Sequence, residues 1–231
     1  RAFASEGAKL FLTGRLRAPV EALAEDIVSA GGSAEAAEVD ALDEQAIDQH
    51  LQSVIDKAGR VDISFNAVGI PTTRILGVPL VELDVEQFCL PITTYSTSYF
   101  LTARLAARRM VANKSGVIMT VTALHSRTGI PCVGGYGPAM AAKEALTRDL
   151  SAELAPQGIR VVGLRPQGMP ETRTIKNAFE PEHAGTLISQ DYRSERPCVE
   201  IIAGRKDVFG LEVFDQDMLG DDLDAWLAQS N

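Results

Sequence analysis

The chain has 231 residues, of which 45% are hydrophobic and 23% charged, and its formal net charge is −9. These values are typical of one medium-sized α/β domain with a substantial buried core. The acidic balance argues against a nucleic-acid-binding surface, which needs clustered Lys and Arg side chains. No apolar run reaches the roughly 20 residues of a membrane-spanning helix, which argues against a membrane partner.

The ends and the cysteines of the chain bear on its location. Cys89, Cys132 and Cys198 are far apart and fit no metal-binding spacing. With no charged-then-apolar leader visible, the sequence predicts a cytoplasmic protein without a bound metal. The chain starts at Arg1, and the stretch from Arg1 to Gly7 is typical of a last helical turn closed by glycine. We therefore expect that residues upstream of Arg1 were removed or lost.

The hydrophobic periodicity alternates between strand and helix patterns. In chain order it predicts a strand at 8–13, a helix at 19–30, a strand at 34–39, a helix at 43–58, strands at 61–65 and 116–121 around a helix at 95–111, a helix at 136–155 and a strand at 159–164. This alternation predicts parallel strands joined by right-handed crossovers, hence a doubly wound, three-layer α/β/α domain. Beyond Thr174 the pattern weakens, with strands expected at 199–202 and 210–214 and a helix at 223–228.

Several short motifs occur along these elements in one order. They are the strand end at Leu12 to Arg15, Asp40 after the next strand, the Asn66-Ala67-Val68-Gly69 turn, the helix that opens at Tyr136 and leads to Gly158, and the strand that ends at Pro166. In this order they resemble the short-chain dehydrogenase/reductase family, from Arg1 to about Thr172. The resemblance implies a Rossmann-type domain over residues 1–172, followed by an unassigned segment over 173–231.

The resemblance also implies an activity, namely NAD(P)-dependent hydride transfer between the cofactor and a small carbonyl or alcohol substrate. The family uses an Asn, a Ser, a Tyr and a Lys together. Here Tyr136 stands at the tyrosine position, whereas Tyr95, Ala123 and Met140 stand at the positions of the asparagine, serine and lysine. The sequence therefore predicts an atypical or impaired active site.

Elementary chemistry explains why these replacements matter. A tyrosine hydroxyl has an ordinary pKa of about 10, so proton transfer near neutral pH is helped by a nearby cation. Lys143 lies two helical turns after Tyr136 and on the same face, so it either replaces the missing lysine or is solvated at the surface. Ser126 or Thr122 would replace the serine, with His125 as an alternative proton carrier, unless the loop is merely polar. The predicted catalytic residues are Tyr136, Lys143 and Ser126.

The cofactor residues follow from the resemblance. They are Arg15, Asp40, Asn66, Gly69, Pro166 and Thr172. Arg15 weakly favours NADP over NAD, although it is equally typical of a solvated cation, and Asp40 would also suit a helix cap. The family's glycine-rich pyrophosphate turn is expected before Arg1, so we expect the given chain to bind dinucleotide poorly or not at all.

Other outcomes stay open at this point. The chain is either an oxidoreductase with an atypical site, a non-catalytic relative kept for binding or assembly, or a truncated or fused gene product. The resemblance also implies a homodimer or homotetramer, with the helices at 95–111 and 136–155 at the interface and their alanines allowing close approach. In the sheet, we expect the strands at 8–13 and 61–65 to pair directly or through upstream residues, and a tail strand to extend the far edge.

Overall fold

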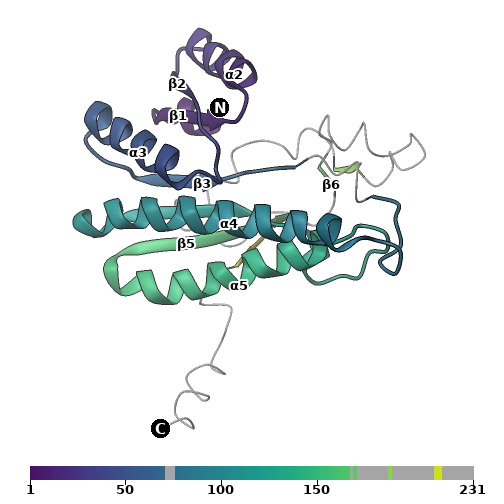
Figure 1. The fold of residues 1–231 in the computed structure, drawn as a ribbon. Helices are drawn as coiled ribbons and strands as arrows, with labels where there is room; N and C mark the ends of the chain where they lie inside the picture. Colours follow the sequence, from purple (N-terminus) through teal and green to yellow (C-terminus); the bar gives the residue numbers. More distant parts are fainter. Residues whose placement is uncertain (71–75, 167–168, 171–186, 189–210, 215–231) are drawn as a thin grey trace, which may run out of the picture.

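The computed structural model describes residues 1–70, 76–166, 169–170, 187–188 and 211–214. Helices and strands alternate through most of this range (Figure 1). The elements are α1 (Ala2–Ser5), β1 (Lys9–Gly14), α2 (Arg17–Ser29), β2 (Ser33–Glu38), α3 (Glu44–Ala58), β3 (Ile63–Asn66), α4 (Val85–Met110), β4 (Gly116–Val121), α5 (Tyr136–Leu154), β5 (Ile159–Pro166), β6 (Met169–Pro170), β7 (Leu187–Ile188) and β8 (Leu211–Phe214), with short 3-10 helices η1 (Val111–Asn113), η2 (Leu124–Ser126) and η3 (Ala155–Gln157).

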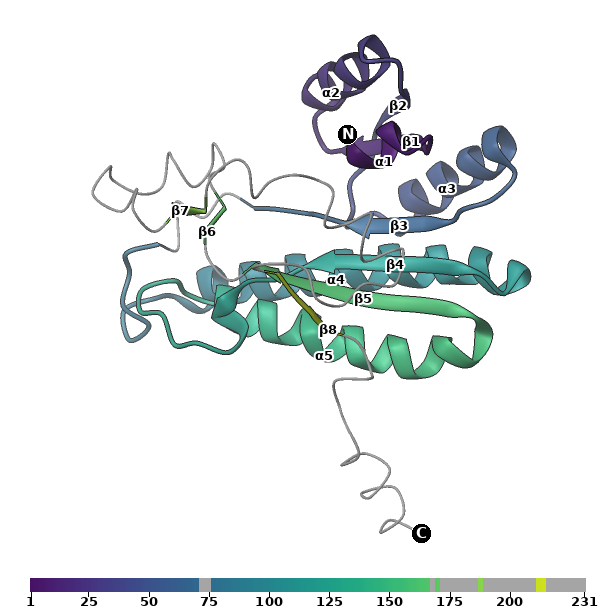
Figure 2. The ribbon, with the colours of Figure 1, turned by 180° about the vertical axis from the view of Figure 1, so that it is seen from behind.

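The strands pair in parallel in the order of a doubly wound sheet. β3, β4 and β5 form a parallel sheet, and β1 pairs with β2 in the same sense. Figure 1 shows α3, α4 and α5 on the same face of these strands, and Figure 2 shows the strands from behind. The predicted α/β class with Rossmann-type alternation is confirmed.

Side-chain burial on this face explains why the helices pack where they do. α4 and α5 bury small and apolar side chains against β4 and β5, in a cluster that includes Tyr99, Ala103, Ala106, Met110, Ile118 and Val161. Covered strands of a parallel sheet are rich in apolar residues, and β5 buries Val161, Val162 and Leu164 although it also carries two arginines. The core therefore holds α5, and with it Tyr136, at the carboxyl end of the sheet.

Capping residues mark where α3 and α4 begin. Asp43 accepts a hydrogen bond from Ala46 N and caps α3, which ends at Gly59 in the left-handed conformation. Asp84 accepts one from Gln87 N and caps α4, so this helix begins at Val85 rather than at Tyr95 as predicted. α4 continues through Pro91. The predicted start was wrong because Pro91 interrupts the helical pattern on which it rested.

The expected direct pairing of the strands at 8–13 and 61–65 is wrong. Within the described residues β1 pairs only with β2, and β3 pairs only with β4. Side-chain packing attaches the β1–β2 unit instead: Phe11 packs against the cluster under α3 and α4, and Phe3 of α1 packs against the Met119–Val162 cluster. Packing of side chains thus replaces a ladder of backbone hydrogen bonds between the two sheets. Pairing through upstream residues stays a prediction.

A strand from the tail does extend the far edge of the sheet, as expected. β8 pairs antiparallel with β5, from Pro166 opposite Leu211 to Gly163 opposite Phe214. The predicted strand at 199–202 and the helix at 223–228 lie outside the described residues. The division of the chain at residue 172 stays a prediction.

Candidate functional site

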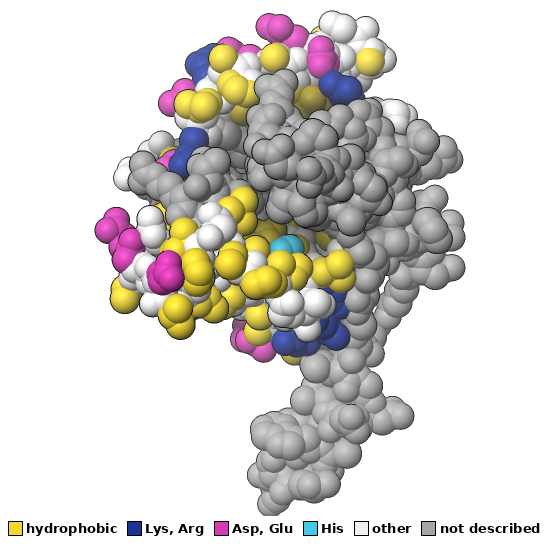
Figure 3. Space-filling view, turned by 90° about the vertical axis from the view of Figure 1, so that its right-hand side faces the viewer, with side chains coloured by type: hydrophobic (Ala, Val, Ile, Leu, Met, Phe, Trp, Pro, Cys, Tyr) yellow, Lys and Arg dark blue, Asp and Glu magenta, His cyan; other side chains and the backbone are white. Residues whose placement is uncertain are grey.

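The candidate site lies where the carboxyl ends of β3, β4 and β5 meet the first turn of α5. Ligands of open α/β sheets bind at this edge. Figure 3 views the molecule from this side and shows hydrophobic side chains gathered there around a histidine. Exposed apolar residues near these ends include Leu80, Val81, Val85 and Ile130.

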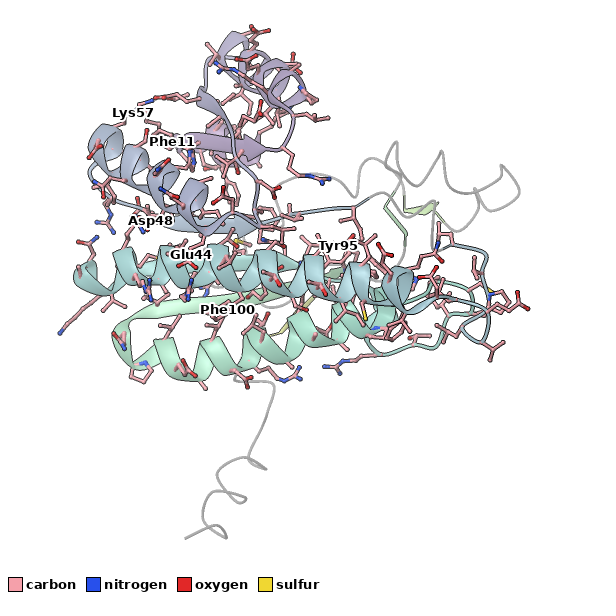
Figure 4. All side chains as sticks on the ribbon, in the orientation of Figure 1. Phe11, Glu44, Asp48, Lys57, Tyr95 and Phe100 are labelled. Carbon is pink, nitrogen blue, oxygen red and sulfur yellow. The ribbon has the colours of Figure 1, made fainter. Side chains whose placement is uncertain are left out.

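Tyr136 stands at the N-terminus of α5 in a cluster of three aromatic rings. The Tyr95 ring lies edge-on to it with centroids 5.8 Å apart, and the His125 ring lies edge-on at 5.0 Å. Figure 4 shows Tyr95 on α4, toward the end of the helix that lies nearest this site. Burial, with Tyr95 adding to it, raises the pKa of Tyr136 above its ordinary value, so the phenol is un-ionised at neutral pH.

Lys143, the candidate to replace the missing family lysine, is buried. Its side chain is 1% exposed, and Nζ donates a hydrogen bond to Val121 O at 2.8 Å. The same Nζ lies 5.6 Å from the ring centroids of Tyr95 and Tyr99. Burial lowers the pKa of Lys143 from 10.5 to about 7. The alternative that Lys143 is solvated at the surface is therefore wrong, and its replacement of the family lysine stays a prediction.

The hydroxyl groups proposed to replace the family serine face a carboxylate. Thr122 Oγ1 donates to Glu144 Oε1 at 3.1 Å, and Ser126 Oγ donates to the same oxygen at 2.5 Å. Ala123 and Met140 stand at the serine and lysine positions, and Met140 is 1% exposed. Within the described residues the Tyr136 hydroxyl has no hydrogen bond to any of these groups.

Glu144 is the residue that sequence reasoning missed. Its carboxylate is buried and pairs with Arg165, whose Nη1 lies 2.7 and 2.8 Å from the two carboxylate oxygens. Arg127 Nε approaches Oε2 at 3.5 Å. This pair joins α5 to the end of β5 beneath the loop that follows β4. The sequence holds no clear signal for this pair, because β5 also carries Arg160 and a charge at a strand end is typical of a solvated side chain.

The candidate cofactor residues differ in what they can do. Arg15 is exposed, whereas Asp40 accepts a hydrogen bond from Leu42 N and so stabilises its own turn. Asn66 is buried at the end of β3; its Nδ2 donates to Thr102 Oγ1, and its Oδ1 has no partner within the described residues. An unpaired buried acceptor at this edge fits a hydroxyl donor such as a ribose. Gly69 leaves open space where a side chain would stand, Pro166 ends β5, and Thr172 lies outside the described residues.

Comparison with known proteins assigns the family. A family model described as enoyl-(acyl carrier protein) reductase matches residues 1–193. The chain belongs to the short-chain dehydrogenase/reductase family. A short-chain type dehydrogenase/reductase from Mycobacterium marinum is a structural neighbour, with a TM-score of 0.71 and 28% identity, over 77% of this chain and 69% of that one.

Two relatives match different lengths of the chain. The 3-oxoacyl-[acyl-carrier-protein] reductase of Synechocystis is 26% identical over 161 residues, which are 70% of this chain and 64% of that protein. The chain thus spans just under two thirds of that relative. An aspartate kinase of Stutzerimonas stutzeri is 92% identical over 47 residues, which are 20% of this chain and 10% of the kinase. The chain is therefore similar to two unrelated classes of protein.

Proposed function

We propose that the protein is an NAD(P)-dependent oxidoreductase that reduces a small carbonyl substrate, with un-ionised Tyr136 as the proton donor. The observation that carries the proposal is the Tyr136 phenol itself. It stands at the family's acid position, and its hydroxyl has no hydrogen bond within the described residues. A hydroxyl in this position, at the ligand-binding edge of the sheet, is suited to donate its proton to a substrate carbonyl oxygen.

The direction of reaction follows from the protonation state of Tyr136. Alcohol oxidation needs a base and hence the phenolate, which the burial of Tyr136 disfavours. Carbonyl reduction needs a proton donor, which the neutral phenol already is. In the family a lysine lowers the tyrosine pKa, and Met140 brings no charge to that position. We therefore assign reduction as the supported direction and expect it to be slow.

The cofactor would supply the hydride. We propose that Asn66 holds its ribose through Oδ1, and that Arg15 favours NADP by facing a 2′-phosphate, since guanidinium groups bind phosphate by charge-assisted hydrogen bonds. Asp40 is the weaker candidate because its carboxylate already accepts from Leu42 N. The expected weak binding of dinucleotide stays a prediction, which calorimetric titration with NADPH and NADH would test.

The test of the function is NADPH oxidation in the presence of small ketones and a 3-oxo thioester, the class named in the relatives. The full chain is compared with Tyr136→Phe, which keeps the ring and removes the donor. Turnover by the wild type and its loss in Tyr136→Phe support the proposal. Turnover that Tyr136→Phe retains would assign the proton to another group.

A second candidate is a fused or truncated gene product without selected activity. Two observations favour it: three of the four family catalytic positions are replaced, and a short segment matches an aspartate kinase at 92% identity. A non-catalytic binding role rests on the replaced catalytic positions alone. Absence of turnover together with absence of NADPH binding would support the fused product, and NADPH binding without turnover would support the binding role.

We also propose a homodimer, or a homotetramer built from it, through the outward faces of α4 and α5. Phe100 is 41% exposed on α4, and Ala141 and Ala145 are exposed on α5, which supports the proposal. The α4 alanines Ala103, Ala106 and Ala107 are instead buried in the chain's own core. Light scattering at micromolar concentration tests the assembly, and a monomer would refute it.

We propose a cytoplasmic location because two of the cysteines form no disulfide. Cys89 and Cys132 are free thiols. Of the helices that the structure describes, none is both long and apolar enough to cross a membrane. Fractionation of cells that express the full chain would test the location.

A further inference from the structure

Among the described residues, two polar groups of the aromatic cluster of Tyr95, His125 and Tyr136 have no hydrogen-bond partner. His125 Nδ1 is buried and has no hydrogen bond within the described residues. The Tyr136 hydroxyl likewise has none there, whereas the Tyr95 hydroxyl accepts from Ile70 N at 3.3 Å. Buried polar atoms are almost always hydrogen-bonded, so the unpartnered His125 Nδ1, on a ring in contact with that of Tyr136, indicates a place where a polar atom of a ligand binds.

The position of His125 is set by the turn that carries it. η2 lies directly against the first turn of α5, because a side chain at Gly137 would stand 3.1 Å from His125 O. The next residue, Ser126, donates its hydroxyl to Glu144 Oε1. Glu144 is in turn fixed by the two short contacts with Arg165. The buried ion pair therefore anchors the turn and holds the imidazole against the Tyr136 ring.

We propose that His125 is the proton-transfer partner of Tyr136, and that Glu144 is the positioning residue that holds it, through Ser126. The proposal rests on the proposed reductase function. A bound reduced nicotinamide would supply the hydride, with its electron pair, to the carbonyl carbon. The Tyr136 O–H bond breaks as its proton joins the carbonyl oxygen, giving the alcohol. The imidazolium of His125 then returns a proton to the Tyr136 oxygen through one intervening water, because no direct hydrogen bond joins the two groups, and His125 takes its own proton from solvent.

The charges around His125 fix the direction of the pH dependence. The groups that face it are Tyr136 of α5 and, in contact with that ring, Tyr95 of α4. Lys143 Nζ lies 5.6 Å from the centroid of the Tyr95 ring. Arg127 and the Glu144–Arg165 pair lie on the Ser126 side, where the carboxylate is neutralised. Burial lowers the pKa of His125 below 6.5. The reduction rate is thus expected to rise as the pH falls toward that pKa.

The experiment compares His125→Gln with a matched control, His50→Gln. His50 is also half-buried with its pKa lowered by burial, but it lies on α3. We expect His125→Gln to lower kcat/KM for ketone reduction about 100-fold and to abolish the rise at acid pH, as is usual for loss of an acid–base group. His50→Gln is expected to change neither. Equal behaviour of the two variants in an active protein would overturn the proposal and leave the reductase function standing.

A second variant and a second readout separate positioning from folding. Ser126→Ala removes the hydrogen bond between the turn and Glu144, whereas the ion pair between Glu144 and Arg165 is kept. In proton NMR the His125 ring resonance is expected to titrate at a higher pH in Ser126→Ala, because the ring loses its fixed buried position, while the His50 resonance is unchanged. A His125 titration that is the same in wild type and Ser126→Ala would overturn the positioning role. This readout needs no turnover, so failure of the reductase function is seen separately, as a wild type that oxidises no NADPH.

Discussion

Lys143 provides a prediction that follows from burial alone. The ammonium is 1% exposed, its hydrogen-bond acceptor is Val121 O, and no carboxylate pairs with it among the described residues. Burial lowers its pKa from 10.5 to about 7. Between these values the unfolded chain holds a proton that the folded chain has released. The free energy of unfolding therefore rises with pH in this window. At and below neutral pH the folded chain is destabilised by the cost of burying the charged Lys143 ammonium.

The magnitude can be worked from the same shift. One pKa unit corresponds to about 1.36 kcal/mol, and Lys143 is about half protonated in the folded chain at pH 7. The expected gain in the free energy of unfolding between pH 7 and pH 9 is then about 2 kcal/mol. Above pH 9 tyrosine ionisation interferes. Urea unfolding at pH 7, 8 and 9, followed by circular dichroism, measures this slope.

The matched variants isolate the contribution of Lys143. Lys143→Met keeps an unbranched side chain and removes the charge, so the pH dependence is expected to flatten. Lys57→Met, which changes a side chain that is 49% exposed and paired with Glu35, is expected to keep the wild-type slope. A wild-type free energy of unfolding that does not rise over this range would refute the reasoning, as would a Lys143→Met variant with an unchanged slope.

Three further predictions concern neighbouring positions. Gly135→Ala is expected to lower the free energy of unfolding by about 1–3 kcal/mol, because its Cβ would stand 2.1 Å from Phe88 O. Gly129 has open space around it, so Gly129→Ala is expected to leave the free energy of unfolding unchanged in the same urea titration. Leu substituted for Glu144 should cost about 3–5 kcal/mol by leaving Arg165 without its carboxylate, and a loss below 1 kcal/mol would show that the pair is not structurally important. Met140→Lys places a cation one turn from Tyr136, so spectroscopic titration should show the tyrosine ionising at lower pH; an unchanged titration would disprove the link between this position and the phenol.

Much of the fold was predictable because its signals are local. The strands at Gly116–Val121 and Ile159–Pro166 and the helix that opens at Tyr136 stand out as apolar runs and helical spacing bounded by glycine. The start of α4 was not predicted, since Pro91 breaks the helical pattern and only the Asp84 cap marks the true end. The absence of pairing between β1 and β3 among the described residues was not predicted, because strand pairing joins segments that are distant in sequence and local periodicity does not determine it.

The site was predictable in its position but not in its contacts. Tyr136 and the replacements at 123 and 140 follow from aligned motifs. Whether Lys143 faces solvent, Tyr136 or the core depends on which helix face α4 covers, and the structure buries it beside Tyr95 and Tyr99. Glu144 and Arg165 lie far apart in sequence, and each alone is typical of a solvated charge. Their pairing becomes visible only when β5 and α5 are brought together.

The most direct test of the account is a single-turnover measurement of NADPH oxidation by the full chain with a small ketone, run in parallel on Tyr136→Phe. We expect slow reduction by the wild type that is faster at acid than at alkaline pH, and loss of that reduction when the Tyr136 hydroxyl is removed. A wild type that binds NADPH but transfers no hydride to any ketone or 3-oxo thioester would contradict it.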